Sequence, residues 1–172
     1  ATLIAHNVVE ETEKLANSFV RNFARKPQGN DRAQIMAVAN GEADIAIANS
    51  YYIGLMLSGK KGSEQKNAAQ KVELHFPNQS GRGTHINISG AGILKSSKNK
   101  ENAEKLIEFL LSKYAQSHIV NNTYEYPILS EVQPNFHILK FGESFKEDQL
   151  SVSNYGKFNP DAVKLMDRVG WE

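Results

Sequence analysis

The fold is most constrained by the place where a short apolar segment runs into two adjacent tyrosines. The segment 44–48 is rich in isoleucine and alanine and ends at a polar pair, a pattern typical of a buried parallel strand. Asn49 and Ser50 are residue types that begin helices. In open α/β sheets ligands bind at the carboxyl ends of strands, and helix N-termini favour anions. We therefore expect Tyr51 and Tyr52 at a ligand-binding position.

The tyrosine pair has two interpretations at this point. Neighbouring tyrosines commonly form a packed aromatic cluster with satisfied hydroxyl groups. A phenol ordinarily has a pKa near ~10, and a trivalent hard cation would make its phenolate form favourable. Hard cations prefer oxygen ligands, and tyrosine is an established iron ligand. Two side chains cannot complete an octahedral shell, so further ligands would come from elsewhere in the protein or from an anion.

The segments around this pair alternate between helix and strand patterns. Leu15, Phe19 and Phe23 form the apolar stripe of a helix over 10–25, which Pro27 ends. Further helices are predicted over 30–39, 50–57, 63–71, 99–111 and 113–120, and a last helix is predicted to begin at Asn159–Pro160. Strands are predicted over 1–5, 44–48, 72–76 and 84–95. Helices and strands at this spacing indicate an α/β fold with a parallel sheet.

Several finer features follow from the same patterns. Gly90 and Gly92 lie inside a predicted strand and mark a bulge or a close approach of backbones. Gly41 is expected to end a helix in the left-handed conformation, and Gly170 to end the last helix. The segment 124–127 is expected to be extended, because a residue before proline avoids the helical region. The predicted core stripes comprise Ala103, Leu106, Ile107, Leu110 and Leu111 in one helix and Val163, Met166 and Val169 in another.

The composition narrows the class of protein. The chain has 172 residues, a net charge of +1 and no cysteine. This length suffices for a sizeable core, and the near-neutral charge argues against nucleic-acid binding, which needs a clustered basic surface. The lack of cysteine excludes disulfides and thiolate sites. The sequence shows no signal peptide and no apolar run near the ~20 residues that cross a bilayer. The start at Ala1, without methionine, suggests a processed chain or a fragment.

Other catalytic constellations receive little support. The five histidines, His6, His75, His85, His118 and His137, show no metal-ligand spacing. The sequence also contains no nucleophile elbow and no phosphate-binding loop. An enzyme that uses His75 and His85 as a metallohydrolase site is the remaining catalytic alternative, although the two lie on either side of a predicted loop.

A set of short motifs resembles one family along essentially the whole chain. In order, these motifs are RNFARKPQGND (21–31), VANGEAD (38–44), ANSYYIG (48–54), FPNQ (76–79), GRGTH (81–85), ISGAG (88–92), NKENA (99–103), YEYP (124–127) and GW (170–171). This series is similar to the periplasmic ferric-ion-binding proteins of ABC iron importers, and most similar to their cyanobacterial-type branch.

The resemblance implies an α/β fold of the periplasmic-binding-protein type II-like kind, with two lobes and iron in the cleft between them. Members of the family are longer, so the architecture is expected to be incomplete at the N-terminal side. The implied division assigns 1–82 to part of the second lobe, which carries the tyrosine pair. It assigns 83–130 to part of the first lobe, and 131–172 to a return to the second lobe with a C-terminal helix.

The resemblance also implies a function. Tyr51 and Tyr52 match adjacent tyrosine ligands of ferric iron, Fe(III). Asn49 and Asn30 match positions that help to hold a synergistic anion such as carbonate, phosphate or citrate. The implied protein is a periplasmic substrate-binding component, a monomer that spans no membrane and binds no nucleic acid. It would deliver iron to an ABC permease in the inner membrane and catalyse no reaction.

Two departures from the family keep alternatives open. The remaining ligands are expected in the part that this chain lacks, and Leu55 stands where relatives often carry arginine. The main competitor is a solute-binding protein for a small organic or inorganic anion, in which the tyrosines would stack on or hydrogen-bond the ligand. A further alternative is that the chain is a structural remnant that binds no ligand of its own.

Overall fold

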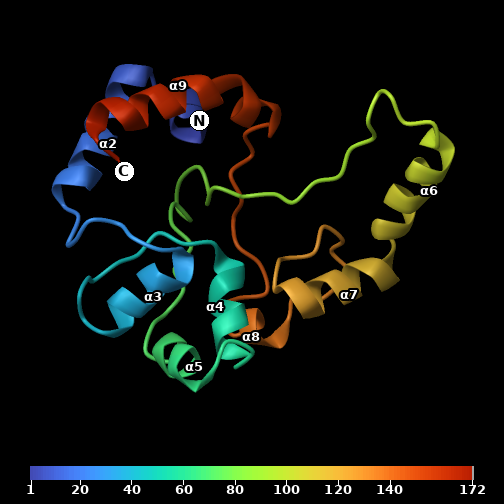
Figure 1. Ribbon diagram of the computed structural model, residues 1–172, viewed down its shortest axis with the longest axis horizontal. Helices are drawn as coiled ribbons and strands as arrows, with labels where there is room; N and C mark the ends of the chain where they lie inside the picture. The colour runs from blue at the N-terminus through green and yellow to red at the C-terminus, as the bar shows by residue number, and fades with distance from the viewer. Residues whose placement is uncertain (172) are drawn as a thin grey trace. The chain divides into compact units, whose positions relative to one another are not determined.

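The computed structural model describes residues 1–171, and their regular secondary structure is helical. The helices are α1 (Thr2–His6), α2 (Val9–Arg21), α3 (Asp31–Ala39), α4 (Ser50–Leu57), α5 (Ser63–Ala69), α6 (Lys100–Leu110), α7 (Lys113–Thr123), α8 (Phe136–Leu139) and α9 (Ser153–Val169), as Figure 1 shows. The chain divides into two compact units. Unit 1 comprises Ala1–Gly29, Pro77–His85 and the chain from Lys146 onward, and unit 2 comprises Asn30–Phe76 and Ile86–Phe145.

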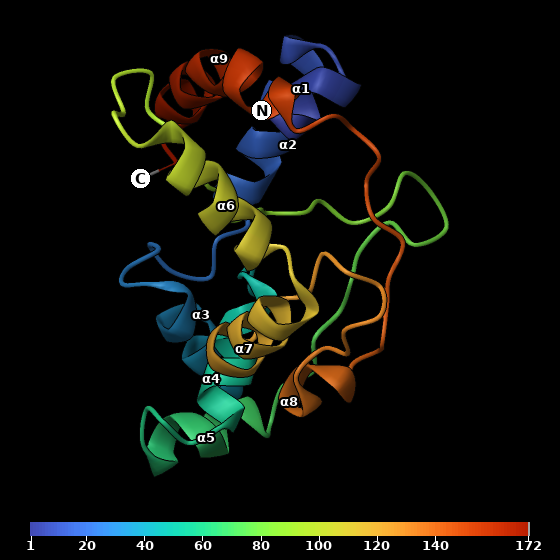
Figure 2. The same cartoon turned by 90° about the vertical axis from the view of Figure 1, so that its right-hand side faces the viewer.

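Unit 1 is built on α1, α2 and α9, which lie side by side in Figures 1 and 2. Its buried residues are Ile4, Ala16, Leu165 and Val169. The segment 1–5, predicted as a strand, is helical instead, because a helix places Ile4 in this cluster. The helix predicted over 10–25 ends at Arg21, so Phe23 lies beyond it, and the predicted stripe is confirmed only in part. Phe19 and Phe23 contact the ring of Trp171 edge to face, with ring centroids 6.0 and 5.2 Å apart.

Helix α9 begins earlier than predicted. The Asn159–Pro160 start is wrong, because Pro160 lies inside a helix that starts at Ser153. The added turns place Phe158 against the cluster that holds Leu165 and Val169, so burial of this side chain outweighs the local capping signal. The predicted stripe is also shifted. Val169 is buried, but Val163 and Met166 are 50% and 39% exposed.

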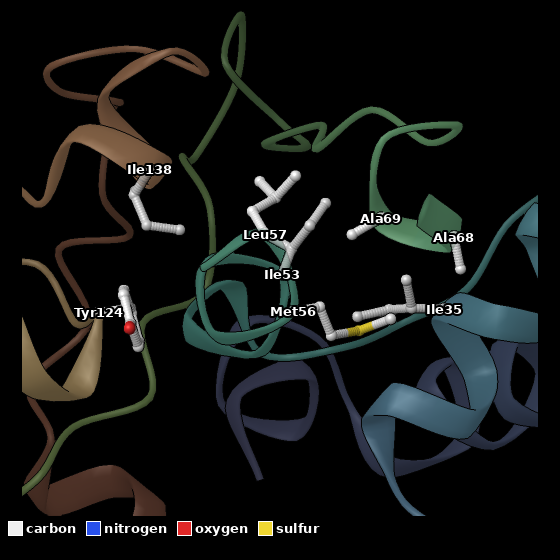
Figure 3. Close-up of a cluster of buried hydrophobic side chains, with 8 residues drawn as sticks. All are labelled: Ile35, Ile53, Met56, Leu57, Ala68, Ala69, Tyr124 and Ile138. Carbon is white, nitrogen blue, oxygen red and sulfur yellow. The ribbon is translucent and has the colours of Figure 1, made fainter. Parts of the chain in front are cut away.

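Unit 2 is organised around α4. Figure 3 shows its side chains Ile53, Met56 and Leu57 between two groups of partners. Ile35 of α3 and the two alanines Ala68 and Ala69 of α5 lie on one side, and Tyr124 and Ile138 lie on the other. Met56 and Ile138 are fully buried. The predicted bounds of α4 are confirmed, as is the end of α3, where Gly41 takes a positive φ of 79°.

The predicted strands do not form within the described residues. The β-type backbone pairing in this part of the chain is one isolated parallel bridge, between Thr84 and Glu147. In the segment 44–48, Ile45 and Ile47 are 84% and 71% exposed. A strand is stable only when a neighbouring strand satisfies its backbone groups. The α/β prediction therefore lacks its sheet here.

Gly170 ends α9 in the left-handed conformation, as predicted, but the glycines of the segment 84–95 depart from expectation. A Cβ on Gly90 or Gly92 would meet nothing within 4 Å, so the predicted close approach there is wrong. The close approach lies at Gly83 instead, where φ is 98° and an added Cβ would lie 2.5 Å from the carbonyl of Glu147. In the segment 124–127, predicted as extended, Tyr124 takes a left-handed conformation with φ of 65° and closes α7.

Candidate metal centre at the tyrosine pair

The two tyrosines lie in the first turn of α4. Their ring centroids are 4.3 Å apart and their planes are inclined by 37°. Both rings are half-buried and pack against the edge of the α4 core. The aromatic packing expected from the sequence is thus present, and it places two phenol rings side by side at the start of α4.

The surroundings favour the neutral form of Tyr51. Its hydrogen bond with Tyr52, together with partial burial, raises the pKa of Tyr51 to about 12. The negative charges of Tyr52, Asp31 and Glu125 act in the same direction. A metal that binds these phenols must therefore displace their protons, which makes binding depend on pH.

Close packing fixes α4 in place. A Cβ at Gly54 would lie 2.8 Å from the Tyr124 Cβ and 2.9 Å from the Ile138 Cδ1. Contacts that short do not occur in folded proteins, so this position accepts only glycine at the observed spacing. Gly54 lies one turn after Ser50, and its contact with Tyr124 therefore also sets where the tyrosine pair lies.

Asn49 connects the start of α4 to two neighbouring segments. Its backbone N–H and its Nδ2 donate to Asp31 Oδ1, at 2.8 and 3.0 Å. Its Oδ1 accepts a hydrogen bond from Asn87 Nδ2 at 2.9 Å. Asn49 therefore occupies the capping position but uses its side chain for tertiary contacts rather than for a cap.

Asn30 is the residue that caps α3. Its Oδ1 accepts hydrogen bonds from the backbone N–H groups of Arg32 and Ala33, at 3.1 and 3.3 Å. The sequence predicts a helix over 30–39, and its start at this position is confirmed. The anion-binding role that the resemblance gives to Asn30 and Asn49 stays a prediction.

Sequence analysis missed the acidic residues around the pair. Asp31 and Glu125 both act on Tyr51, and Ser89 donates to Glu125 Oε1 at 2.5 Å. The sequence contains one feature that could have drawn attention to each of these two acidic residues. Asp31 directly follows the capping Asn30, and Glu125 lies in the YEYP motif between two aromatic residues.

The histidines do not form a second centre. Within residues 1–171, no group of three or more His, Cys, Asp or Glu residues could hold a metal ion. His85 lies in unit 1, where its Nδ1 is 3.0 Å from the hydroxyl of Thr2. His75 belongs to unit 2. His6 Nε2 is 2.7 Å from Asp148 Oδ2, a buried carboxylate in unit 1.

A model of the bacterial extracellular solute-binding proteins matches residues 14–117, which is more than half of the chain. The chain belongs to this family. A relative of this solute-binding chain, Iron uptake protein A1 of Synechocystis sp., is 47% identical over 172 residues, all of this chain and 47% of the relative. The Major ferric iron-binding protein of Neisseria meningitidis is 30% identical over 145 residues, 84% of this chain and 42% of the relative.

Solved structures of solute-binding proteins agree with the sequence comparison. A Trichodesmium IdiA (FutA) structure in complex with iron and citrate has a TM-score of 0.95 and 50% identity, over 99% of this chain and 54% of that one. A ferric binding protein from Campylobacter jejuni has a TM-score of 0.92 and 40% identity, over 99% of this chain and 54% of that one. The chain thus spans about half the length of the proteins it matches, and its relatives are solute-binding transport proteins, not enzymes.

Proposed function

We propose that this chain is part of the substrate-binding component of an ABC importer, and that Tyr51 and Tyr52 bind ferric iron through their phenolates. The observation that carries the proposal is the pair of adjacent phenol rings in the first turn of α4, with centroids 4.3 Å apart. Two adjacent hard oxygen donors suit a trivalent cation. The iron-binding names of the similar proteins support the same cargo.

The family of the chain supports a role in transport. The complete protein would capture iron in the periplasm as a monomer and deliver it to a permease in the inner membrane. No helix in the described part of the chain combines the length and the apolar character needed to span a bilayer. The lobe assignment of 1–82, 83–130 and 131–172 remains a prediction about that longer protein, as does the closure of its lobes around iron.

The two phenols would be only part of the coordination shell. We therefore expect the 172-residue chain to bind iron weakly, with carbonate, phosphate or citrate filling some of the remaining positions. Citrate is present with iron in the similar Trichodesmium structure. Asn49 and Asn30 remain candidates for holding such an anion. Asn49 Nδ2 donates one of its two protons to Asp31, and Asn30 caps α3 through its oxygen, so both side-chain amides have a further proton to donate.

A ferric citrate titration tests the proposal. The chain should develop a visible phenolate-to-iron charge-transfer band that a strong chelator removes. Tyr51→Phe and Tyr52→Phe should each abolish most of the band. Tyr114→Phe is the matched control, because Tyr114 lies on α7 and is 75% exposed. A band that survives Tyr51→Phe would contradict the iron assignment and favour the anion-binding alternative, in which Tyr51 contributes only a hydrogen bond.

A further inference from the structure

A series of hydrogen bonds links two carboxylates to the segments around the tyrosine pair. Asp31 Oδ1 accepts hydrogen bonds from the backbone N–H and the Nδ2 of Asn49. Asn87 Nδ2 then donates to Asn49 Oδ1 at 2.9 Å. Two residues further along the chain, the hydroxyl of Ser89 donates to Glu125 Oε1 at 2.5 Å. The segment that holds Asn87 and Ser89 therefore contacts both the residue before α4 and the second carboxylate.

Packing fixes Glu125 relative to α4. The preceding residue, Tyr124, is 3% exposed and belongs to the core cluster around α4. Its Cβ lies 2.8 Å from the point that a Cβ on Gly54 would occupy. Gly54 and the tyrosine pair are on the same short helix. Tyr124 thus anchors Glu125 beside that helix, and Ser89 orients the carboxylate.

The two carboxylates differ in how many of their acceptor positions already receive hydrogen bonds. Asp31 lies at the first position of α3, where the helix dipole stabilises a negative charge, and one of its oxygens accepts two hydrogen bonds. Glu125 is half-buried, lies outside any helix, and accepts from Ser89 through Oε1. Because an ionised carboxylate has about four acceptor positions, Glu125 retains capacity for a cation.

We propose that Glu125 is a specificity-determining residue of the tyrosine site, and that its charge makes the site prefer a trivalent cation to an anion. This inference rests on the proposed function, since it takes Tyr51 and Tyr52 as the iron-binding pair. A fixed negative charge attracts a trivalent cation more strongly than a divalent one, and it repels a phosphate or carboxylate ligand as long as no metal is bound. It also adds a hard oxygen donor of the kind that such cations select.

The test uses Ga(III), a trivalent ion that does not change oxidation state, supplied to the metal-free chain as its nitrilotriacetate complex. Glu125→Gln removes the charge but keeps an oxygen that accepts from Ser89. It should weaken Ga(III) binding on the order of tenfold or more. Glu104→Gln, which removes the same charge from the exposed face of α6, should change binding less than about twofold. Inorganic phosphate should bind Glu125→Gln no more weakly than it binds the unsubstituted chain.

The outcomes separate this inference from the proposed function. If Tyr51→Phe binds Ga(III) as tightly as the unsubstituted chain, the proposed function fails and the role of Glu125 falls with it. If Tyr51→Phe loses Ga(III) while Glu125→Gln retains the affinity of Glu104→Gln, the inference alone is wrong. Thermal melting checks the fold of each variant. Should Glu125→Gln melt early, Ga(III) binding is measured well below its melting temperature, where an affinity equal to that of Glu104→Gln would overturn the inference.

Discussion

Helices α4 and α6 both carry runs of large apolar side chains, yet only one of them is buried. Four of the eight residues of α4 are buried, whereas α6 has no buried residue along its eleven. In α6, Leu106 and Phe109 are 58% and 52% exposed. The predicted core stripe of α6 therefore forms no core in this chain.

The two helices differ in the partners that cover their apolar side chains. Helix α4 contacts α3, α5 and α8, while α6 has α7 as its main helical neighbour. Since most of the stability of a helix in a protein comes from tertiary packing, an apolar stripe stabilises the fold only where another element covers it. Substitutions in the two helices should consequently differ in their effect on stability.

The largest difference is expected from shortening one apolar side chain in each helix. Met56→Ala in α4 should lower the free energy of unfolding by ~2–5 kcal/mol, because Met56 is fully buried and the change leaves a cavity. Leu106→Ala in α6 should cost about 0.5 kcal/mol or less, as is usual at exposed positions. Urea unfolding measures both. Equal losses would show that α6 is covered in solution and would break the comparison.

The next largest effect concerns glycines within helices. Gly54→Ala should destabilise the chain by ~1–3 kcal/mol, because its Cβ would overlap Tyr124 and Ile138. Gly156→Ala in α9 is the matched control, since nothing lies within 4 Å of the added Cβ. That change should stabilise the helix by up to about 1 kcal/mol. Thermal melting of both variants gives the answer. A stabilising Gly54→Ala would mean that α4 does not pack closely against Tyr124.

A pH effect is expected from the tyrosine pair at the start of α4. The pKa of Tyr51 is raised to about 12, so the folded chain holds this proton more tightly than the unfolded chain, whose tyrosines titrate near ~10. The stability from Tyr51 is therefore complete below pH ~10 and is lost as the pH rises toward about 12. Burial also raises the pKa of Tyr126 to about 12. Phenolate absorbance in the metal-free chain should therefore show a component near pH 12 that is about half as large in Tyr51→Phe, where Tyr126 alone contributes to it.

The control for this titration is Tyr114→Phe, which should leave that component in place because Tyr114 lies on α7, away from α4. A loss of absorbance near pH 10 instead of near pH 12 in Tyr51→Phe would show that the surroundings do not raise the pKa of Tyr51 in solution.

The smallest effect is expected on the apolar side of α6. Phe109→Ser exchanges a half-exposed ring for a hydroxyl and should shift the free energy of unfolding by no more than about 0.5 kcal/mol. Its ring contact with Tyr114, with centroids 6.2 Å apart, contributes little at this exposure. Chemical denaturation is again the measurement. A loss above about 1 kcal/mol would indicate that this face is buried against another surface.

Local signals in the sequence sufficed where the chain supplies its own partners. The bounds of α4, the Asn30 cap of α3 and the left-handed Gly41 follow from residue type and periodicity alone. The tyrosine pair could be singled out as well, because two phenols after an apolar segment at a helix start are an unusual arrangement. The motifs around Tyr51 and Tyr52 supplied the family resemblance, and the resemblance supplied the prediction of iron binding.

Tertiary contacts decided what the sequence could not show. The segment 44–48 has a strand pattern, but no strand pairs with it in the described chain. Phe158 extends α9 past the cap signal at Asn159 because its ring packs on unit 1. Glu125 comes near Tyr51 through contacts between segments far apart in the sequence, which no local pattern encodes.

The shortness of α4 has a practical consequence for protein engineering. Its first turn holds the phenols and its remaining turns hold the core, so one rigid element of eight residues serves both purposes. A change of volume at Met56 that shifts the helix will therefore also displace Tyr51 and Tyr52. Libraries aimed at a different cargo should vary the residues around the phenols, such as Asn87 and Glu125, and leave 53–57 untouched.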